Sequence, residues 1–318
     1  MGKLPHKRLQ QILDFLDPGV FRLETAQSDE RMIREDGSLR PLFPAMTLET
    51  GKGEIWGVFG HDPLELSLLL EKFSGIGSAH GIAAHSSFYL ASSDLLPPHV
   101  KLLEAAMQVT RKMPGDLILR QETLLDELIS LGLGQLSLTL VSRMSQEERA
   151  LSSLYVAAKT PAPLIFFNLP ALDFDLTQMA FLEALARLIG RGGRALVLST
   201  TDSQVVETVC DHTAFLLDGQ LVFQGSVDEL LSRHDPTLFE IEGDRLDLLK
   251  DRLTATFSGL NLNLEEGRLI LEADKKHPVD QAVLLEVIGR TGIPAPDRIT
   301  AAKSARRAFQ ALERAHAL

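Results

Sequence analysis

Strand-like and helix-like hydrophobic patterns alternate along the first two thirds of the chain. Strand-length apolar runs occur at 21–25, 45–50, 52–60, 163–168 and 194–200, with a further candidate within 76–92 and a hairpin signal over 214–225. Helical periodicity follows at 64–75 and at 176–193. Strands and helices that alternate in this way, joined by short loops, predict an α/β fold with a mainly parallel sheet.

Ligand sites in such sheets lie beyond the carboxyl ends of the strands. Gly60, Asn168 and Thr200 are the residues that fall at these ends. The loops that follow these three residues are therefore the expected place of a functional site.

Two other regions follow a helical pattern. Residues 94–150 show helical periodicity and little strand signal, which predicts an inserted helical subdomain. Apolar residues also recur at helical spacing within 1–19 and stop at Asp17-Pro18-Gly19, which predicts a leader helix.

The pattern changes again around His234-Asp235-Pro236. Residues 237–318 show the order strand, helix, strand, strand, helix, strand, followed by one last helix. This order predicts a small α+β (ferredoxin-like) domain, separate from a larger domain over 20–234.

Composition narrows the possible functions. The net charge is −11, and a nucleic-acid-binding surface needs a basic footprint, so no nucleic-acid partner is expected. The single cysteine, Cys210, excludes a disulfide framework and fits a reducing compartment. No stretch has the length and apolar character of a signal peptide or a membrane span, so we expect a cytoplasmic protein that does not cross the bilayer.

The run PLIFFNLPALDFD raises a chemical question. An apolar strand ends at Asn168 and is followed by Leu169 and a proline. A strand end that holds a metal ion or activates a water is expected to present a carboxylate. Neither Asn168 nor Leu169 supplies one.

Two segments resemble the nucleotide-binding subunit of an ATP-binding-cassette (ABC) transporter. KGEIWGVFG resembles the strand that enters the family's phosphate loop, and STTDSQVVETVCDHTAFLLDGQLVFQGSVDELL resembles the family's STHxxxEAExxCDRxxxLxxGxxxxxGxxxEL. The order of elements is similar over nearly the whole chain, and residues 237–318 resemble the extra C-terminal domain of the drug- and polysaccharide-export branch. The resemblance implies an ABC-type P-loop ATPase fold.

The phosphate loop departs from the family's GPNGAGKST. Gly60 and Ser67 match its first glycine and its hydroxyl, but Pro63 and Glu65 replace glycines and Leu66 replaces the lysine. A phosphate loop needs backbone N–H groups around the phosphates and a lysine to neutralise their charge. The resemblance therefore implies a loop that has lost its chemistry.

The strand end at Asn168 and Leu169 departs in the same way, since the family has Asp-Glu-Pro there for Mg²⁺ and the attacking water. Ser92 stands at the glutamine of the glutamine loop and Thr201 at the switch histidine.

The family's signature, LSGGQ, appears as VSRMS. Ser142 is kept, while Arg143 and a methionine replace the glycines. Asp175 matches the aspartate of the loop after the Walker B strand. Gly60, Ser67, Ser142, Arg143 and Asp175 are therefore vestigial binding positions, and no catalytic residue, metal site or cofactor is expected; His80 and His85 lack partners at metal spacing.

The leading interpretation is a degenerate ABC subunit, a pseudo-ATPase. It would be peripheral on the inner face of the cell membrane, bound to permease subunits through 94–150 and paired with a second, competent ATPase subunit. One alternative is a weak Mg·ATP hydrolase in which Asp62 or Asp175 handles Mg²⁺. Another is a soluble scaffold that kept the fold and left the transporter.

Overall fold

The computed structural model describes most of the chain. The described residues are 20–25, 31–33, 39–41, 45–75, 87–90, 96–112, 115–169, 172–233, 238–256, 260–265, 267–273, 281–294, 296–301 and 304–316. The expected leader helix at 1–19 lies outside them, as do His80, His85 and Ser92.

The chain forms two compact units, Met1–Val227 and Asp228–Leu318. The sequence pattern places this division a few residues later, at 234–237. Helix α8 (Val227–Arg233) spans the interval between the two positions.

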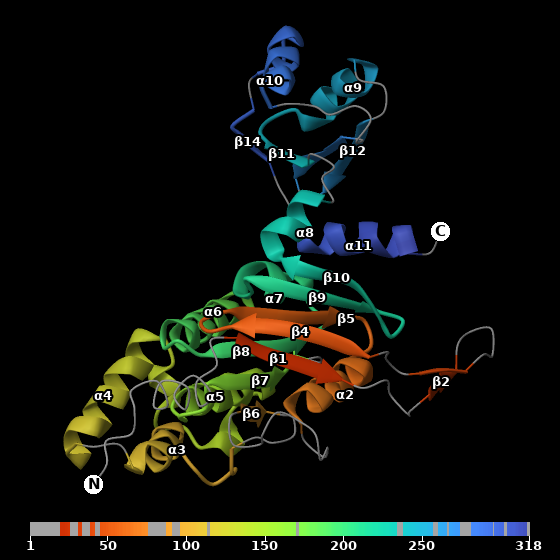
Figure 1. The fold of residues 1–318 in the computed structure, drawn as a ribbon. Helices are drawn as coiled ribbons and strands as arrows, with labels where there is room; N and C mark the ends of the chain where they lie inside the picture. The colour runs from red at the N-terminus through yellow and green to blue at the C-terminus, as the bar shows by residue number, and fades with distance from the viewer. Residues whose placement is uncertain are drawn as a thin grey trace, which may run out of the picture. The chain divides into compact units, whose positions relative to one another are not determined.

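A six-stranded sheet in the order β10-β9-β5-β8-β7-β6 forms the centre of the larger unit (Figure 1). Its strands are β5 (Ile55–Gly60), β6 (Ser87–Leu90), β7 (Leu164–Asn168), β8 (Ala195–Thr200), β9 (His212–Leu217) and β10 (Gln220–Ser226). All neighbouring pairs are parallel except the β9–β10 hairpin. The predicted mainly parallel sheet is confirmed.

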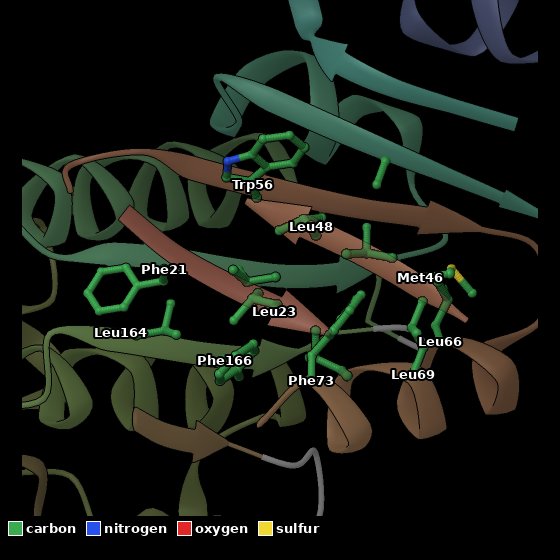
Figure 2. Close-up of a cluster of buried hydrophobic side chains, with 14 of the residues drawn as sticks. Phe21, Leu23, Met46, Leu48, Trp56, Leu66, Leu69, Phe73, Leu164 and Phe166 are labelled. Carbon is green, nitrogen blue, oxygen red and sulfur yellow. The ribbon is translucent and has the colours of Figure 1, made fainter. Parts of the chain in front are cut away.

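Two layers cover this sheet. One is α2 (Pro63–Ser74) with the antiparallel pair β1 (Val20–Thr25) and β4 (Met46–Gly51), whose side chains share one apolar cluster with those of β5, β7 and β8 (Figure 2). The other includes α6 (Leu176–Arg191) and α7 (Ser203–Val209), which contact β8 and β5. At Gly57 in β5, an added Cβ would lie 2.8 Å from Cys210 Sγ, so a glycine there allows the segment after α7 to approach the sheet closely.

Between β1 and β4 the sequence predicts only a polar stretch. The structure has a second short pair there, β2 (Arg31–Ile33) and β3 (Leu39–Pro41). Three-residue strands carry too few positions for an alternating pattern to be recognised.

Helices are present where the sequence predicts an inserted helical subdomain. They are α3 (Leu102–Val109), α4 (Leu117–Ser130) and α5 (Gln146–Ala158), with 3₁₀ turns at Thr110–Lys112, Gly134–Leu136 and Val141–Arg143. Because α5 ends just before β7, this helical region leads directly back into the central sheet.

The smaller unit has a four-stranded antiparallel sheet in the order β12-β13-β11-β14. Its elements are β11 (Leu238–Glu242), α9 (Leu246–Thr256), β12 (Leu260–Glu265), β13 (Arg268–Ala273), α10 (Gln281–Arg290), β14 (Arg298–Ala301) and α11 (Ala305–His316). Side chains of α9 and α10 pack on one face of the sheet around Phe239 and Leu271. This is the predicted ferredoxin-like order.

Candidate functional site

Three neighbouring strands, β5, β8 and β7, end at the same edge of the central sheet. Their last residues are Gly60, Thr200 and Asn168, as the sequence predicts. Parallel pairing sets Asn168 opposite Ser199, so polar side chains from two strands meet in the interior at this edge.

Asn168 connects three elements through its side-chain amide. Its Nδ2 donates to Ser67 Oγ of α2 at 2.8 Å, and its Oδ1 accepts from Ser199 Oγ of β8 at 2.6 Å. The amide is almost fully buried. The hydroxyl that matches the family's Mg²⁺ ligand is therefore bound to a neutral amide of the same chain.

Ser199 was not recognised as a site residue from the sequence. Its only signal is a hydroxyl within the apolar run RALVLST. Its role depends on the register between β7 and β8, which joins residues 31 positions apart.

The start of α2 occupies the position of the phosphate loop. Only His61 and Asp62 separate β5 from the helix, which begins at Pro63. Asp62 is the N-cap residue, and its Oδ1 accepts from the N–H groups of Leu64 at 2.9 Å and Glu65 at 3.4 Å. The N–H groups that a phosphate would need at this helix start are bound to a carboxylate, and Pro63 has no N–H.

Leu66, at the position of the phosphate-binding lysine, is fully buried and belongs to the core cluster (Figure 2). A Cβ added at Gly60 would lie 3.0 Å from Leu216 O and 3.2 Å from Leu66 Cδ2. The absence of a side chain at Gly60 therefore allows Leu66 to pack closely against the end of β5. This role of the glycine does not involve a phosphate.

We expect Asp62→Ala to lower the free energy of unfolding by about 1 kcal/mol, because the substitution leaves two N–H groups of α2 without their cap. Urea denaturation followed by circular dichroism measures this change. Asp173→Ala is the matched control, since Asp173 is an exposed loop carboxylate and its loss is expected to change stability by less than about 0.5 kcal/mol. Equal stability of the two variants would contradict the capping role.

Two further aspartates at this edge are also helix caps. Asp175 accepts from Gln178 N at 2.8 Å in a capping box at the start of α6, and Asp202 accepts from Gln204 N at 2.8 Å at the start of α7. Thr201 lies between β8 and this second cap. The loops 60–63, 168–175 and 200–203 contain no lysine or arginine. The edge is thus negatively charged, which is unfavourable for a polyphosphate.

The signature segment forms the 3₁₀ turn Val141–Arg143 before α5. The N–H groups of Ser142, Arg143 and Met144 donate to the carbonyl oxygens of Pro98, Leu140 and Val141 at 3.0, 2.8 and 3.2 Å. The side chain of Met144 is buried, whereas Ser142 and Arg143 are exposed. These three backbone N–H groups already donate within the chain, so only the exposed side chains of Ser142 and Arg143 face outward.

Helix α5, which follows this segment, has its own cap. Ser145 Oγ accepts from Glu148 N, and Glu148 Oε2 accepts from Ser145 N at 2.8 Å. The first turn of α5 therefore carries acidic side chains, as does the start of α2.

The segment that most resembles the family makes structural contacts. Asp211 Oδ2 accepts from Ile55 N at 3.1 Å, which ties the loop before β9 to the start of β5. Its Oδ1 pairs with Arg187 Nη1 of α6 at 2.6 Å. The resemblance over 199–230 thus coincides with contacts that hold the sheet together.

Other kinds of site find little support. Within the described residues, no group of three or more His, Cys, Asp or Glu side chains is placed to hold a metal ion. Burial raises the pKa of the Cys210 thiol, which disfavours the reactive thiolate. None of the described helices has both the length and the apolar character that a membrane span requires.

No family model matches the chain. In sequence, it is 33% identical over 94 residues to the methionine import ATP-binding protein MetN of Wolinella succinogenes, which is 30% of this chain and 28% of that protein. It is 34% identical over 85 residues to the nickel import ATP-binding protein NikD of Rhodospirillum rubrum, covering 26% of this chain and 33% of that one. The aligned part thus spans at most a third of either relative.

Solved structures align with a much larger part of the chain than these sequence relatives do. The ATP-binding subunit of an ABC transporter aligns with a TM-score of 0.51 and 16% identity over 67% of this chain and 93% of that one. The protein cbiO1 from Clostridium perfringens, described as part of the ABC transporter complex cbiONQ, aligns with a TM-score of 0.50 and 13% identity over 73% and 94%.

Over the aligned part, the chain therefore has the fold of an ABC ATP-binding subunit. Together with the partial sequence similarity, the fold supports a relationship to the ABC transporter ATP-binding subunits. The expected drug- and polysaccharide-export branch stays a prediction.

Proposed function

We propose that this chain is a non-catalytic ABC subunit that acts in the structure and regulation of a transporter. The observation that carries the proposal is the start of α2, where the carboxylate of Asp62 takes the N–H groups that would bind a phosphate. A bound phosphate would have to displace this carboxylate or lie beside its negative charge.

The hydrogen bonds of Asn168 to Ser67 and Ser199, called the Asn168 network below, support the same conclusion. A Mg²⁺ ion needs oxygen ligands, and Asn168 presents its amide N–H₂ to Ser67 Oγ, the hydroxyl at the position of the family's Mg²⁺ ligand. Leu169 supplies no base, and its side chain is buried. Asn168 and Leu169 thus offer no carboxylate for metal binding or for the activation of water, which supports the proposal.

The weak-hydrolase alternative requires a free carboxylate. Its two candidates, Asp62 and Asp175, both serve as helix caps. Using either for Mg²⁺ would remove that cap, so nothing in this geometry favours the alternative.

Partners are proposed from the fold and the surface. The helical region exposes large apolar side chains that a monomer would leave in water, among them Leu117, Ile118 and Leu138. We propose that this region contacts a permease subunit at the inner face of the membrane. Because this chain offers no hydrolytic site, a second, competent ATPase subunit would power transport.

We expect isothermal titration of the purified chain with Mg·ATP to show no binding up to about 1 mM nucleotide, because the N–H groups of α2 are bound to Asp62. Titration with ATP alone is the control for weak, metal-independent binding. A dissociation constant in the micromolar range would overturn the non-catalytic proposal. Failure to co-purify with any permease subunit from membranes would instead favour the scaffold alternative.

A further inference from the structure

A cavity lies at the opposite edge of the sheet from Asn168. It is open to solvent, has a volume of about 510 Å³ and is lined by α4, the end of α5 and the turn before β8. Thr160 and Gly192, which line it, precede the amino ends of β7 and β8. Since β7 has five residues of about 3.3 Å each, the cavity is roughly 16 Å or more from the Asn168 network. Its size is within the range of small-molecule sites.

One side of the cavity holds a mostly buried ion pair. Lys159 Nζ contacts Glu127 Oε1 of α4, and the same ammonium lies 5.0 Å from the centre of the Tyr155 ring. The Tyr155 hydroxyl in turn donates to Leu124 O at 3.3 Å. The carboxylate of Glu127 is therefore matched by Lys159, and these contacts fix the position of the pair.

Arg194 is a second cation on the cavity wall. Its Nη1 donates to the neutral Thr160 O at 3.0 Å, and no ion pair joins it to any of the residues that the structure describes. Partial burial lowers its pKa, and the nearby charge of Glu127 only partly offsets this effect. A partly buried guanidinium that faces a cavity with a neutral partner has donors left for an anion.

The mouth of the cavity adds two features. Helix α4 starts there, and the side chain of its N-cap residue, Asp116, makes no capping hydrogen bond. Arg120 from the first turn also lines the cavity and donates to Gly115 O at 3.2 Å. With Arg120, Lys159 and Arg194 against Asp116 and Glu127, the ionised lining has a net charge of +1.

Part of the remaining wall is apolar. Leu119 and Leu124 of α4 and Ala158 of α5 line the cavity between the charged groups. Leu119 is 61% exposed at the mouth, so its side chain does not support the fold. A ligand that satisfies both parts of the lining needs an anionic head and an apolar body.

We propose that this cavity binds a small organic carboxylate with an apolar body. The ligand's carboxylate lies against the Arg194 guanidinium, whose planar array of N–H donors matches the two oxygens of a carboxylate. The apolar body of the ligand lies along Leu119, Leu124 and Ala158. Binding is non-covalent and does not depend on nucleotide, because the site shares no residue with the Asn168 network.

The test is calorimetric titration of the full chain with octanoate as the probe and 1-octanol as the uncharged comparison. We expect octanoate to bind with a dissociation constant on the order of 1 mM and octanol at least tenfold more weakly. Arg194→Gln should weaken octanoate binding at least tenfold, as loss of a charge-assisted contact does. Arg191→Gln, which removes an exposed charge three residues away that does not line the cavity, should leave binding unchanged.

A second variant tests the proposal even if Arg194→Gln does not fold. Leu119→Glu places a negative charge at the mouth from an exposed position in the first turn of α4, where an acidic residue favours the helix. It should abolish octanoate binding while the thermal unfolding midpoint stays within about 2 °C of the parent. The proposal is overturned if the parent chain does not bind octanoate at 10 mM, if octanol binds equally well, or if Leu119→Glu binds as the parent does.

Discussion

Leu66→Lys is expected to lower the free energy of unfolding of the larger unit by about 4 kcal/mol, although it restores the lysine of a phosphate loop. Leu66 is fully buried and belongs to the apolar cluster to which α2, β4 and β7 contribute (Figure 2). An ammonium there would have no partner, and an unpaired buried charge costs several kcal/mol. Because a domain of this kind is stable by only about 5–15 kcal/mol, the variant should be close to unfolding.

Leu64→Lys is the matched control for this prediction. Leu64 belongs to the same first turn of α2 but is 64% exposed, so its substitution should change stability by less than about 0.5 kcal/mol. Urea denaturation of both variants gives the difference, and titration with Mg·ATP should show that neither binds nucleotide. Equal stability of the two variants would mean that a lysine at 66 extends to the sheet edge, and it would contradict the core position of Leu66.

The architecture could be predicted from the sequence because it depends on local periodicity. Strands β5, β7 and β8 are apolar runs bounded by polar or glycine residues, and each forms close to its predicted place. The predicted strand at 52–60 is shorter in the structure, where it begins at Ile55. Gly53 has a φ of +82°, and Glu54 N donates to Gly51 O at 3.3 Å in the turn before it.

The loss of motif residues was also visible in the sequence, but its structural consequence was not. His61 and Asp62 form the short connection between β5 and α2. The capping of α2 by Asp62 depends on where the helix begins, and the position of Pro63 gives only a hint of this.

Long-range pairing explains the rest of what the sequence did not reveal. Ser199 meets Asn168 only because β7 and β8 pair in one particular register. Similarly, Glu127 and Arg194 lie on one cavity although 67 positions separate them. No local pattern carries such information, since each residue alone is typical of its own element.

The second large effect concerns the end of β7. We expect Asn168→Asp combined with Leu169→Glu to give no ATP hydrolysis above background, although it restores the family's two acids. The start of α2 would still be capped by Asp62, and the phosphate loop would still lack its lysine and glycines. Catalytic groups that act as a unit give little activity when only some are present. Phosphate release measured with 5 mM Mg·ATP tests this expectation.

The same double variant should lose about 4 kcal/mol of stability, mainly through Leu169. This side chain is 1% exposed, and its N–H donates to Ser199 O at 2.9 Å, so the backbone is not free to turn a new carboxylate outward. At position 168 the cost should be smaller, about 1–2 kcal/mol, because the hydroxyls of Ser67 and Ser199 are both able to donate to an aspartate.

Leu176→Glu is the matched control, since Leu176 is 81% exposed at the first position of α6, where a negative charge favours the helix. It should be at least as stable as the parent in urea, while the double variant unfolds at much lower denaturant. If the double variant is as stable as the control and releases phosphate, then the Asp62-capped start of α2 is not what prevents hydrolysis. The missing acids alone would then explain the lost activity.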